Sequence, residues 1–272
     1  SINTVYKVQM EGHMRLKAMA KINLGLDVLG KREDGYHEVR MIMQTIRMYD
    51  ILDIRKTRRP GIVLTTNLPF IPTDQRNLVY KAAQMLMEEF DVEEGLSIKL
   101  RKFIPVAAGM AGGSSDAAAA FVGVNRMFHL GLTEEQLMER AVKVGADVPY
   151  CIMRGTALAE GIGEKLTRLP EVPKCYVLIG KPGINVSTKT AYENLNLEGI
   201  GKHPDIDGLI GAIRNNDLYA MASRMENVFE PGIIGKYPVI QEIKDLMEAH
   251  GALKAMMSGS GPTVFGIFDD KN

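Results

Sequence analysis

Apolar and polar residues alternate strictly in the segment AMAKINLGLDV, residues 18–28. In an extended chain this spacing puts the apolar side chains on one side and polar ones, Lys21 and Asn23 among them, on the other. The segment is therefore predicted to be a β-strand with one buried face.

The same reading predicts a mixture of strands and helices along the rest of the chain. Further strands are expected at residues 41–54, 62–66 and 97–106 and from about residue 174, and a strand, tight turn and strand at 254–268. Helices are expected at residues 77–90, 117–128, 133–145, 188–195, 205–214, 216–226 and 238–250. Because strict β-α-β alternation is absent, the pattern favours an α+β fold.

Helix-start signals support two of these helices. Ser114 or Ser115 is expected to cap the helix at 117–128, with Asp116 in its first turn. Thr133 is expected to cap the next helix, and Gln136 completes a capping box.

Composition narrows the class of protein. The 272 residues carry 33 basic and 33 acidic side chains, so no net field attracts nucleic acid or an anionic membrane. No apolar run is long enough to span a bilayer, and no secretory segment is expected. Cys151 and Cys175 lack metal-ligand spacing and are interpreted as core thiols of a cytoplasmic protein. Residues 12–14, GHM, resemble the remnant of an expression vector, so residues 1–13 are expected to be an added or disordered extension.

The segment PVAAGMAGGSSDAAAA, residues 105–120, is the strongest candidate for a ligand site. Its glycines allow backbone N–H groups to approach an anion, and the following helix adds its unsatisfied N–H groups and positive dipole end. A flexible turn before a core helix would look similar, but the Gly-Gly-Ser-Ser helix start favours phosphate. The loop lacks the lysine of a P-loop, so a cation must come from elsewhere.

Three other features are ambiguous by themselves. Lys21 could supply the cation, although a solvated strand face would also carry lysines. Asp147, in GADVPYC, is expected where a helix has ended, because Pro149 favours an extended Val148; a turn-capping role is the simpler reading. SGSGPT, residues 258–263, reads more as a hairpin turn than as a site.

Taken together, these motifs resemble those of the GHMP kinases. AKINLGLDVLGKREDGYHEV, PVAAGMAGGSSDAA, GADVPYC, GTALAEGIGE and MSGSGPTVFGIF occur in the family's order, from about Met14 to Phe268. The combination of DGYHE, GADVP and AEGIGE is most similar to the member that phosphorylates a cytidine diphosphate-linked methylerythritol. One mild departure is Ala107-Ala108, where many relatives have glycines.

The resemblance implies a two-domain fold and a set of site residues. The domains would be an ATP-binding domain at residues 14–172, like a ribosomal-protein domain, and a ferredoxin-like domain at 173–272. ATP and Mg²⁺ would be the cofactors, and the protein would be a monomer or homodimer without nucleic-acid or membrane partners. Asp147 and Lys21 would be catalytic, Asn77 would lie near the adenosine, and Tyr36, His37 and Asn23 would bind substrate. The ATP phosphates would lie on Pro105, Val106, Ala107, Ala108, Gly109, Met110, Ala111, Gly112, Gly113, Ser114 and Ser115.

Three rival functions stay open at this level. A related kinase of mevalonate-type, homoserine or sugar substrates would have no use for an aromatic platform at DGYHE. The basic stretch RKTRRP, residues 55–60, would suit a nucleic-acid module, against which the zero net charge argues. A protein that binds ATP without turnover is excluded only by assay.

Overall fold

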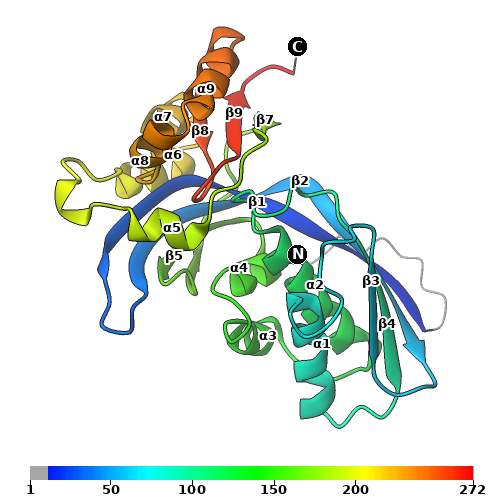
Figure 1. The fold of residues 1–272 in the computed structure, drawn as a ribbon. Helices are drawn as coiled ribbons and strands as arrows, with labels where there is room; N and C mark the ends of the chain where they lie inside the picture. Colours follow the sequence, from blue (N-terminus) through cyan, green and yellow to red (C-terminus); the bar gives the residue numbers. More distant parts are fainter. Residues whose placement is uncertain (1–11, 272) are drawn as a thin grey trace. The chain divides into compact units, whose positions relative to one another are not determined.

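A computed structural model of the chain describes residues 12–271 (Figure 1). Its strands are β1 (His13–Lys31), β2 (His37–Thr57), β3 (Ile62–Thr66), β4 (Gly95–Arg101), β5 (Thr156–Gly161), β6 (Lys165–Arg168), β7 (Tyr176–Gly180), β8 (Lys254–Met257) and β9 (Val264–Phe268). The helices are α1 (Leu78–Glu89), α2 (Gly112–Met127), α3 (Glu134–Ala141), α4 (Val148–Met153), α5 (Thr188–Glu193), α6 (Ile206–Arg214), α7 (Leu218–Arg224), α8 (Glu230–Lys236) and α9 (Val239–Ala249), with a 3₁₀ turn η1 (Leu197–Gly199). The α+β prediction is confirmed.

The chain forms two compact units that interleave along the sequence. Of the described residues, the first comprises 12–20, 47–106 and 111–153, and the second comprises 21–46, 107–110 and 154–271. The long strands β1 and β2 contribute to both units. Since these units are groupings of contacts in space, the predicted division at residues 172 and 173 stays a prediction.

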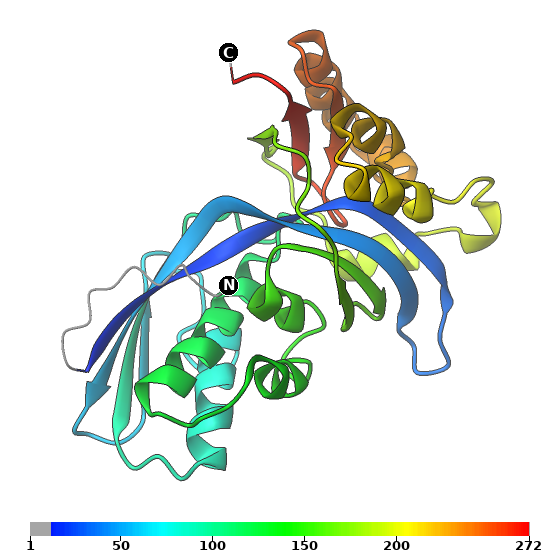
Figure 2. The same ribbon diagram turned by 180° about the vertical axis from the view of Figure 1, so that it is seen from behind.

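In the first unit, helices cover one face of a sheet (Figures 1 and 2). β4 pairs antiparallel with the second half of β2, Ile51 opposite Arg101, and parallel with β3, Ile62 opposite Leu96. Helix α1 packs on α2, and α4 packs on both α2 and α3. Leu52, Ile54, Leu96 and Ile98 are fully buried, and Phe121 of α2 is fully buried as well.

The second unit contains two pieces of sheet. β5 pairs with the first half of β2, Val39 opposite Gly161, and with β6. A separate antiparallel sheet has the order β7-β9-β8, and α9 packs against β8 and β9 (Figure 2).

Strand β1 differs from its prediction in both length and burial. It begins at His13, so this end of the predicted 1–13 extension is structured, while residues 1–11 lie outside the described residues. The alternating side chains of residues 18–28 were expected to have one buried face, and this is wrong. Lys21, Asn23 and Asp27 are buried like their apolar neighbours, because the polar face is covered by hydrogen-bonding partners rather than by water.

Most other elements lie within a few residues of their predicted positions. The capping box of Thr133 and Gln136 is confirmed at the start of α3. Short elements without their own periodic pattern escaped prediction, namely α4, α8, β5, β6 and η1. No helix among residues 12–271 combines the length and apolarity needed to cross a membrane.

Candidate active site

Lys21 is the buried cation beside the glycine-rich loop. Its side chain is 5% exposed, and Nζ donates to Asn23 Oδ1 at 2.6 Å and to the Gly109 carbonyl at 3.1 Å. The Lys21 backbone N–H also donates to the Met110 carbonyl at 3.2 Å. Strand β1 and the loop are therefore joined through both backbone and side chain, and these acceptors orient the ammonium group.

Asn23 holds Lys21 from the strand side. Its side chain is fully buried, with Oδ1 accepting from the ammonium group and Nδ2 directed at Met41 Sδ, 3.5 Å away. In this geometry Asn23 orients Lys21, so a direct contact between Asn23 and substrate stays a prediction.

Ser258 holds the same loop from the C-terminal turn. Its Oγ donates to the Gly109 carbonyl at 2.9 Å and accepts from the Asn23 N–H at 3.3 Å. Gly109 has a φ of +80°, and a Cβ added there would lie 2.2 Å from the Ser258 carbonyl oxygen. The turn at 258–263 was read as a plain hairpin, because its contact with a loop about 150 residues earlier has no local signal.

Helix α2 begins earlier than predicted. Ala111, in the left-handed conformation with φ 54°, occupies the N-cap position, and the Ser115 N–H donates to its carbonyl. The expected caps Ser114 and Ser115 are thus wrong, and Asp116 lies beyond the first turn. Because the Ser115 N–H makes the first intrahelical bond, to Ala111, the N–H groups of residues 112–114 have no partner within the helix.

The two serines of this helix start have different surroundings. Ser115 is buried, and its Oγ donates to the Met19 carbonyl at 2.6 Å. Ser114 is half-buried and follows the exposed Gly113. Ser114 is therefore the better placed hydroxyl for an anion at the helix N-terminus.

Two alanines of the loop have positive φ angles, 51° at Ala107 and 54° at Ala111. A left-handed conformation costs a residue with a Cβ about 1–2 kcal/mol. Such strain persists only where surrounding contacts impose it, and it concentrates at ligand sites. Ala107 therefore holds a backbone conformation that a glycine would adopt without this strain.

Behind the helix start lies a buried ion cluster that the sequence reading missed. Lys102 Nζ lies 2.6 Å from both Asp50 Oδ2 and Asp116 Oδ2, and all three side chains are buried. Asp50 Oδ1 also accepts the backbone N–H groups of Phe103 and Ile104. The cluster therefore joins the segment that enters the loop to the helix that leaves it.

Burial and mutual contact shift the pKa values of Asp116 and Lys102 in this cluster. Asp116 Oδ1 is buried and has no hydrogen-bond partner within residues 12–271. Burial raises the pKa of the Asp116 carboxyl well above its ordinary value, more than the Lys102 ammonium group lowers it. Burial also works to lower the pKa of Lys102, but its two carboxyl partners outweigh this effect and raise it. The Lys102 ammonium group is therefore favoured in its charged form, and the Asp116 carboxyl ionises less readily than a free aspartate.

Asp147 lies at the start of α4. Its carbonyl accepts the Cys151 N–H at 3.1 Å, which makes Asp147 the residue that precedes the first helical turn. The expected extended Val148 is wrong: Val148 begins α4, with Pro149 second, where a missing N–H costs no helical hydrogen bond. Asp147 belongs to the first unit and Lys21 to the second, so their meeting stays a prediction.

Tyr36 directly precedes β2 in the second unit, and His37 is the first residue of that strand. The Tyr36 side chain is 59% exposed, whereas the His37 ring stacks on Tyr192 of α5 with centroids 4.7 Å apart. Burial, helped by the nearby Lys31, lowers the pKa of His37 and favours its neutral form. Tyr192, which packs edge-on against Phe229, is an aromatic partner that the sequence reading missed.

Asn77 has a structural role in the described geometry. Its Oδ1 accepts the Val79 N–H at 2.9 Å and caps α1, and its Nδ2 donates to the Pro72 carbonyl at 2.9 Å. A contact between Asn77 and adenosine stays a prediction.

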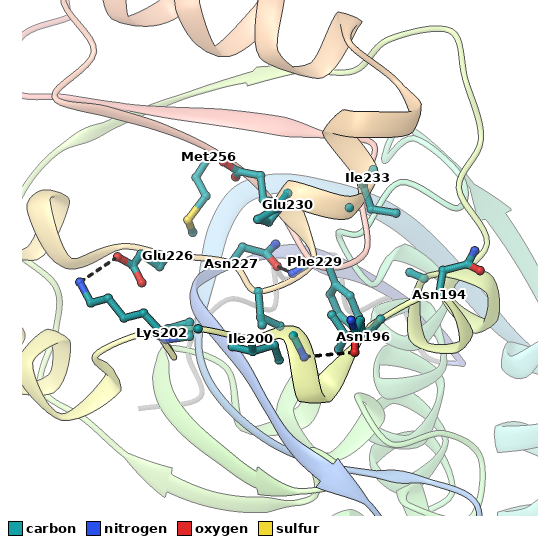
Figure 3. A pocket seen from close by; sticks show the side chains of 18 of the residues that line it. Asn194, Asn196, Ile200, Lys202, Glu226, Asn227, Phe229, Glu230, Ile233 and Met256 are labelled. Atoms are coloured by element: carbon teal, nitrogen blue, oxygen red, sulfur yellow. Dashed lines mark hydrogen bonds and ion pairs between the residues drawn. The ribbon is translucent and has the colours of Figure 1, made fainter.

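A pocket of about 500 Å³ lies elsewhere in the second unit (Figure 3). Apolar side chains such as Ile200, Phe229, Ile233 and Met256 form much of its wall. None of the predicted site residues lines it. Figure 3 shows Asn227 in the wall beside Glu226 and Phe229.

Similarity to known proteins identifies the class to which the chain belongs. Family models for the GHMP kinase N-terminal domain and C-terminal domain match residues 77–155 and 209–272. A crystal structure of homoserine kinase from Cytophaga hutchinsonii has a TM-score of 0.77 at 20% identity over 98% of this chain and 89% of its own, and shows the fold alone. These matches define the class, a kinase of the GHMP fold, whose members use ATP.

Sequence similarity is higher to one branch of that class. The chain is 57% identical over 258 residues to the 4-diphosphocytidyl-2-C-methyl-D-erythritol kinase of Lachnospira eligens, covering 95% of this chain and 90% of the relative. It is 51% identical to the enzyme of that name from Caldicellulosiruptor bescii, covering 95% and 90%. A crystal structure of 4-(cytidine 5'-diphospho)-2C-methyl-D-erythritol kinase matches with a TM-score of 0.81 and 31% identity, covering 94% of this chain and 90% of its own. The chain belongs to the 4-diphosphocytidyl-2-C-methyl-D-erythritol kinase family.

Proposed function

We propose that this kinase transfers the γ-phosphoryl group of ATP to the 2-hydroxyl of 4-diphosphocytidyl-2-C-methyl-D-erythritol, in non-mevalonate isoprenoid precursor synthesis. The observation that carries the proposal is the buried Lys21 ammonium group, held by Asn23 and the Gly109 carbonyl against the glycine-rich loop. Membership of the family supplies the substrate class.

Phosphoryl transfer needs positioning and charge stabilisation more than covalent chemistry. The substrate hydroxyl oxygen forms a bond to the γ-phosphorus, the bond from that phosphorus to the ADP oxygen breaks, and Asp147 accepts the hydroxyl proton. Lys21 offsets the charge of the phosphoryl group in transfer. The free N–H groups at residues 112–114 and the Ser114 hydroxyl would hold phosphate oxygens.

Mg²⁺ would arrive bound to the ATP phosphates and neutralise part of their charge. Within residues 12–271 no three His, Cys, Asp or Glu side chains are grouped as a metal cage. This is compatible with Mg²⁺, which usually keeps several waters and takes only one or two protein oxygens besides phosphate. The half-buried Ser114 hydroxyl is the protein oxygen that we propose for it.

The exposed Tyr36 ring would stack on the cytosine, with the neutral His37 beside it offering ring nitrogens to the base edge. Tyr192 supports His37 from its other side. We further propose a cytoplasmic monomer or homodimer, for which gel filtration with light scattering is the direct measurement.

The deciding experiment is ATP-dependent phosphorylation of 4-diphosphocytidyl-2-C-methyl-D-erythritol, compared at equal concentration with mevalonate and homoserine. We expect turnover only of the cytidyl substrate. Preferred turnover of homoserine or mevalonate would overturn the substrate assignment while leaving the kinase class intact.

A further inference from the structure

Asn227 is a buried asparagine that no predicted role involves. It lies between α7 and α8, and its side chain is 5% exposed. Its side-chain hydrogen bonds go to backbone groups: Nδ2 donates to the carbonyls of Met257 and Gly259, both at 2.8 Å, and Oδ1 accepts the Phe229 N–H at 3.0 Å. Figure 3 shows it in the pocket wall, next to Phe229.

The segment that Asn227 holds is the turn that contacts the glycine-rich loop. Met257 and Gly259 flank Ser258, whose Oγ donates to the Gly109 carbonyl at 2.9 Å. The same carbonyl accepts from Lys21 Nζ at 3.1 Å. A displacement of the turn would therefore move an acceptor of the Lys21 ammonium group.

Asn227 is also fixed to the strand that carries Lys21. Its neighbours pair with β1: the Leu26 N–H donates to the Glu226 carbonyl, and the Val228 N–H donates to the Leu26 carbonyl, both at 3.0 Å. Leu26 follows Lys21 and Asn23 on this strand. Asn227 thus links two segments. One is β1, which carries the Asn23 acceptor, and the other is the turn that contacts the Gly109 acceptor.

We propose that Asn227 is a positioning residue for phosphoryl transfer, acting through the turn at Ser258 to set the Lys21 ammonium group against the Asn23 and Gly109 acceptors. The proposal rests on the proposed function, because it takes Lys21 to be catalytic. Asn227 touches none of the reacting groups itself. Its effect is on geometry, and a misplacement of about 1 Å can cost about 100-fold in rate.

The test compares two asparagines of the same pocket wall. Asn227→Asp keeps the size and the Oδ1 acceptor but removes both donors to the turn. Asn196→Asp is the control for an Asn-to-Asp change away from the turn, because the exposed Asn196 accepts the Gly199 N–H through Oδ1 at 3.1 Å and, within residues 12–271, has no hydrogen bond to the turn at 258–261. Kinetics would be measured with saturating ATP and the cytidyl substrate, per folded molecule as judged by circular dichroism.

We expect Asn227→Asp to lower kcat by about 10–100-fold, with KM for the cytidyl substrate within about twofold of the parent protein. Asn196→Asp should leave both constants unchanged. Because both act on one turn, the double variant Asn227→Asp with Ser258→Ala should lose little more than the worse single variant. A purely structural asparagine would instead lower the unfolding temperature and leave kcat per folded molecule intact.

Three results would overturn the proposal: an unchanged kcat in folded Asn227→Asp, an equal loss in Asn196→Asp, or losses that multiply in the double variant. If Asn227→Asp does not fold, Asn227→Ser, which keeps one donor in a smaller side chain, is assayed by the same criteria. Failure of the proposed function is a different outcome, in which the parent protein itself does not phosphorylate the cytidyl substrate.

Discussion

The Lys102 ammonium group lies 2.6 Å from the Asp116 carboxyl at the start of α2, and both side chains are buried. The Asp50 carboxyl lies at the same distance from this ammonium group. Two carboxyls and one cation in a dry environment leave one carboxyl short of charge compensation. Asp116, with its unpartnered Oδ1, is that carboxyl.

This arrangement predicts a pH-dependent stability that resides at Asp116. Because its pKa is raised in the folded protein from an ordinary 3.8, the folded state binds this proton more tightly than the unfolded state. The stabilising contribution is complete below about pH 4 and is lost as pH rises through the folded-state pKa. Asp116→Asn removes this titration, so the free energy of unfolding of the variant minus that of the parent protein should rise as pH increases above about 4.

Urea unfolding at a series of pH values measures this. Asp74→Asn is the control, because the Arg76 guanidinium lowers the pKa of Asp74 to about 2, below the window. Its curve should run parallel to that of the parent protein. A parallel curve for Asp116→Asn as well would contradict the charge assignment in the cluster.

Removal of the Lys21 ammonium group should damage turnover more than binding. We expect Lys21→Met to lower kcat by about 100-fold or more, in the range for lost electrostatic stabilisation. Asp147→Asn should lower kcat by about 10²–10⁴-fold as a general base. The double variant should lose less than the product of the two, because the residues act as a unit.

Lys17→Met is the matched control, since Lys17 lies on the same strand with its ammonium group over the Tyr49 ring, 4.1 Å from the centroid. It should keep the parent kcat. A fall of less than about tenfold in folded Asp147→Asn would make Asp147 a turn residue without a role as base.

The two glycines at the start of α2, Gly112 and Gly113, differ in what an added side chain would contact. A valine at Gly112 would disturb packing, because its Cβ would lie 3.2 Å from Ile104 Cγ2. A Cβ at Gly113 would meet nothing within 4 Å. We therefore expect Gly113→Val to fold and to raise the dissociation constant for ATP by about tenfold, since it adds bulk beside the free N–H groups.

Calorimetric titration with ATP and Mg²⁺ measures this effect. Gly211→Val in α6 is the control, because it also has open space within 4 Å of its added Cβ. It should fold and keep the parent protein's affinity for ATP. Unchanged ATP affinity in folded Gly113→Val would remove the helix start from the nucleotide site.

Tyr36 should contribute to binding of the cytidyl substrate and not of ATP. Stacking of a base on an aromatic side chain is worth about 1–3 kcal/mol, so Tyr36→Ala should raise KM for the cytidyl substrate by about tenfold or more. Tyr219→Ala is the control, an equally exposed tyrosine at 63% that donates to Asp269. Steady-state kinetics with each substrate varied in turn would decide, and equal damage to both substrates would count against a cytidine pocket.

Local sequence determined the class of fold and the main candidates for the site. Period-2 and period-3.6 patterns and capping residues are short-range signals, so β3 and the capping box of α3 could be placed from neighbouring residues alone. The glycine-rich loop was recognisable because its chemistry is contained within about ten consecutive residues.

Tertiary structure decided which polar residues are buried and what they hold. The alternation of residues 18–28 could not show that Lys21 and Asn23 would be enclosed, because their partners come from residues 109 and 258. Lys102 looked like an ordinary charged strand residue until Asp50 and Asp116 surrounded it. A buried polar group needs partners to offset its lost hydration. Those partners are distant in sequence, so only the folded chain could specify them.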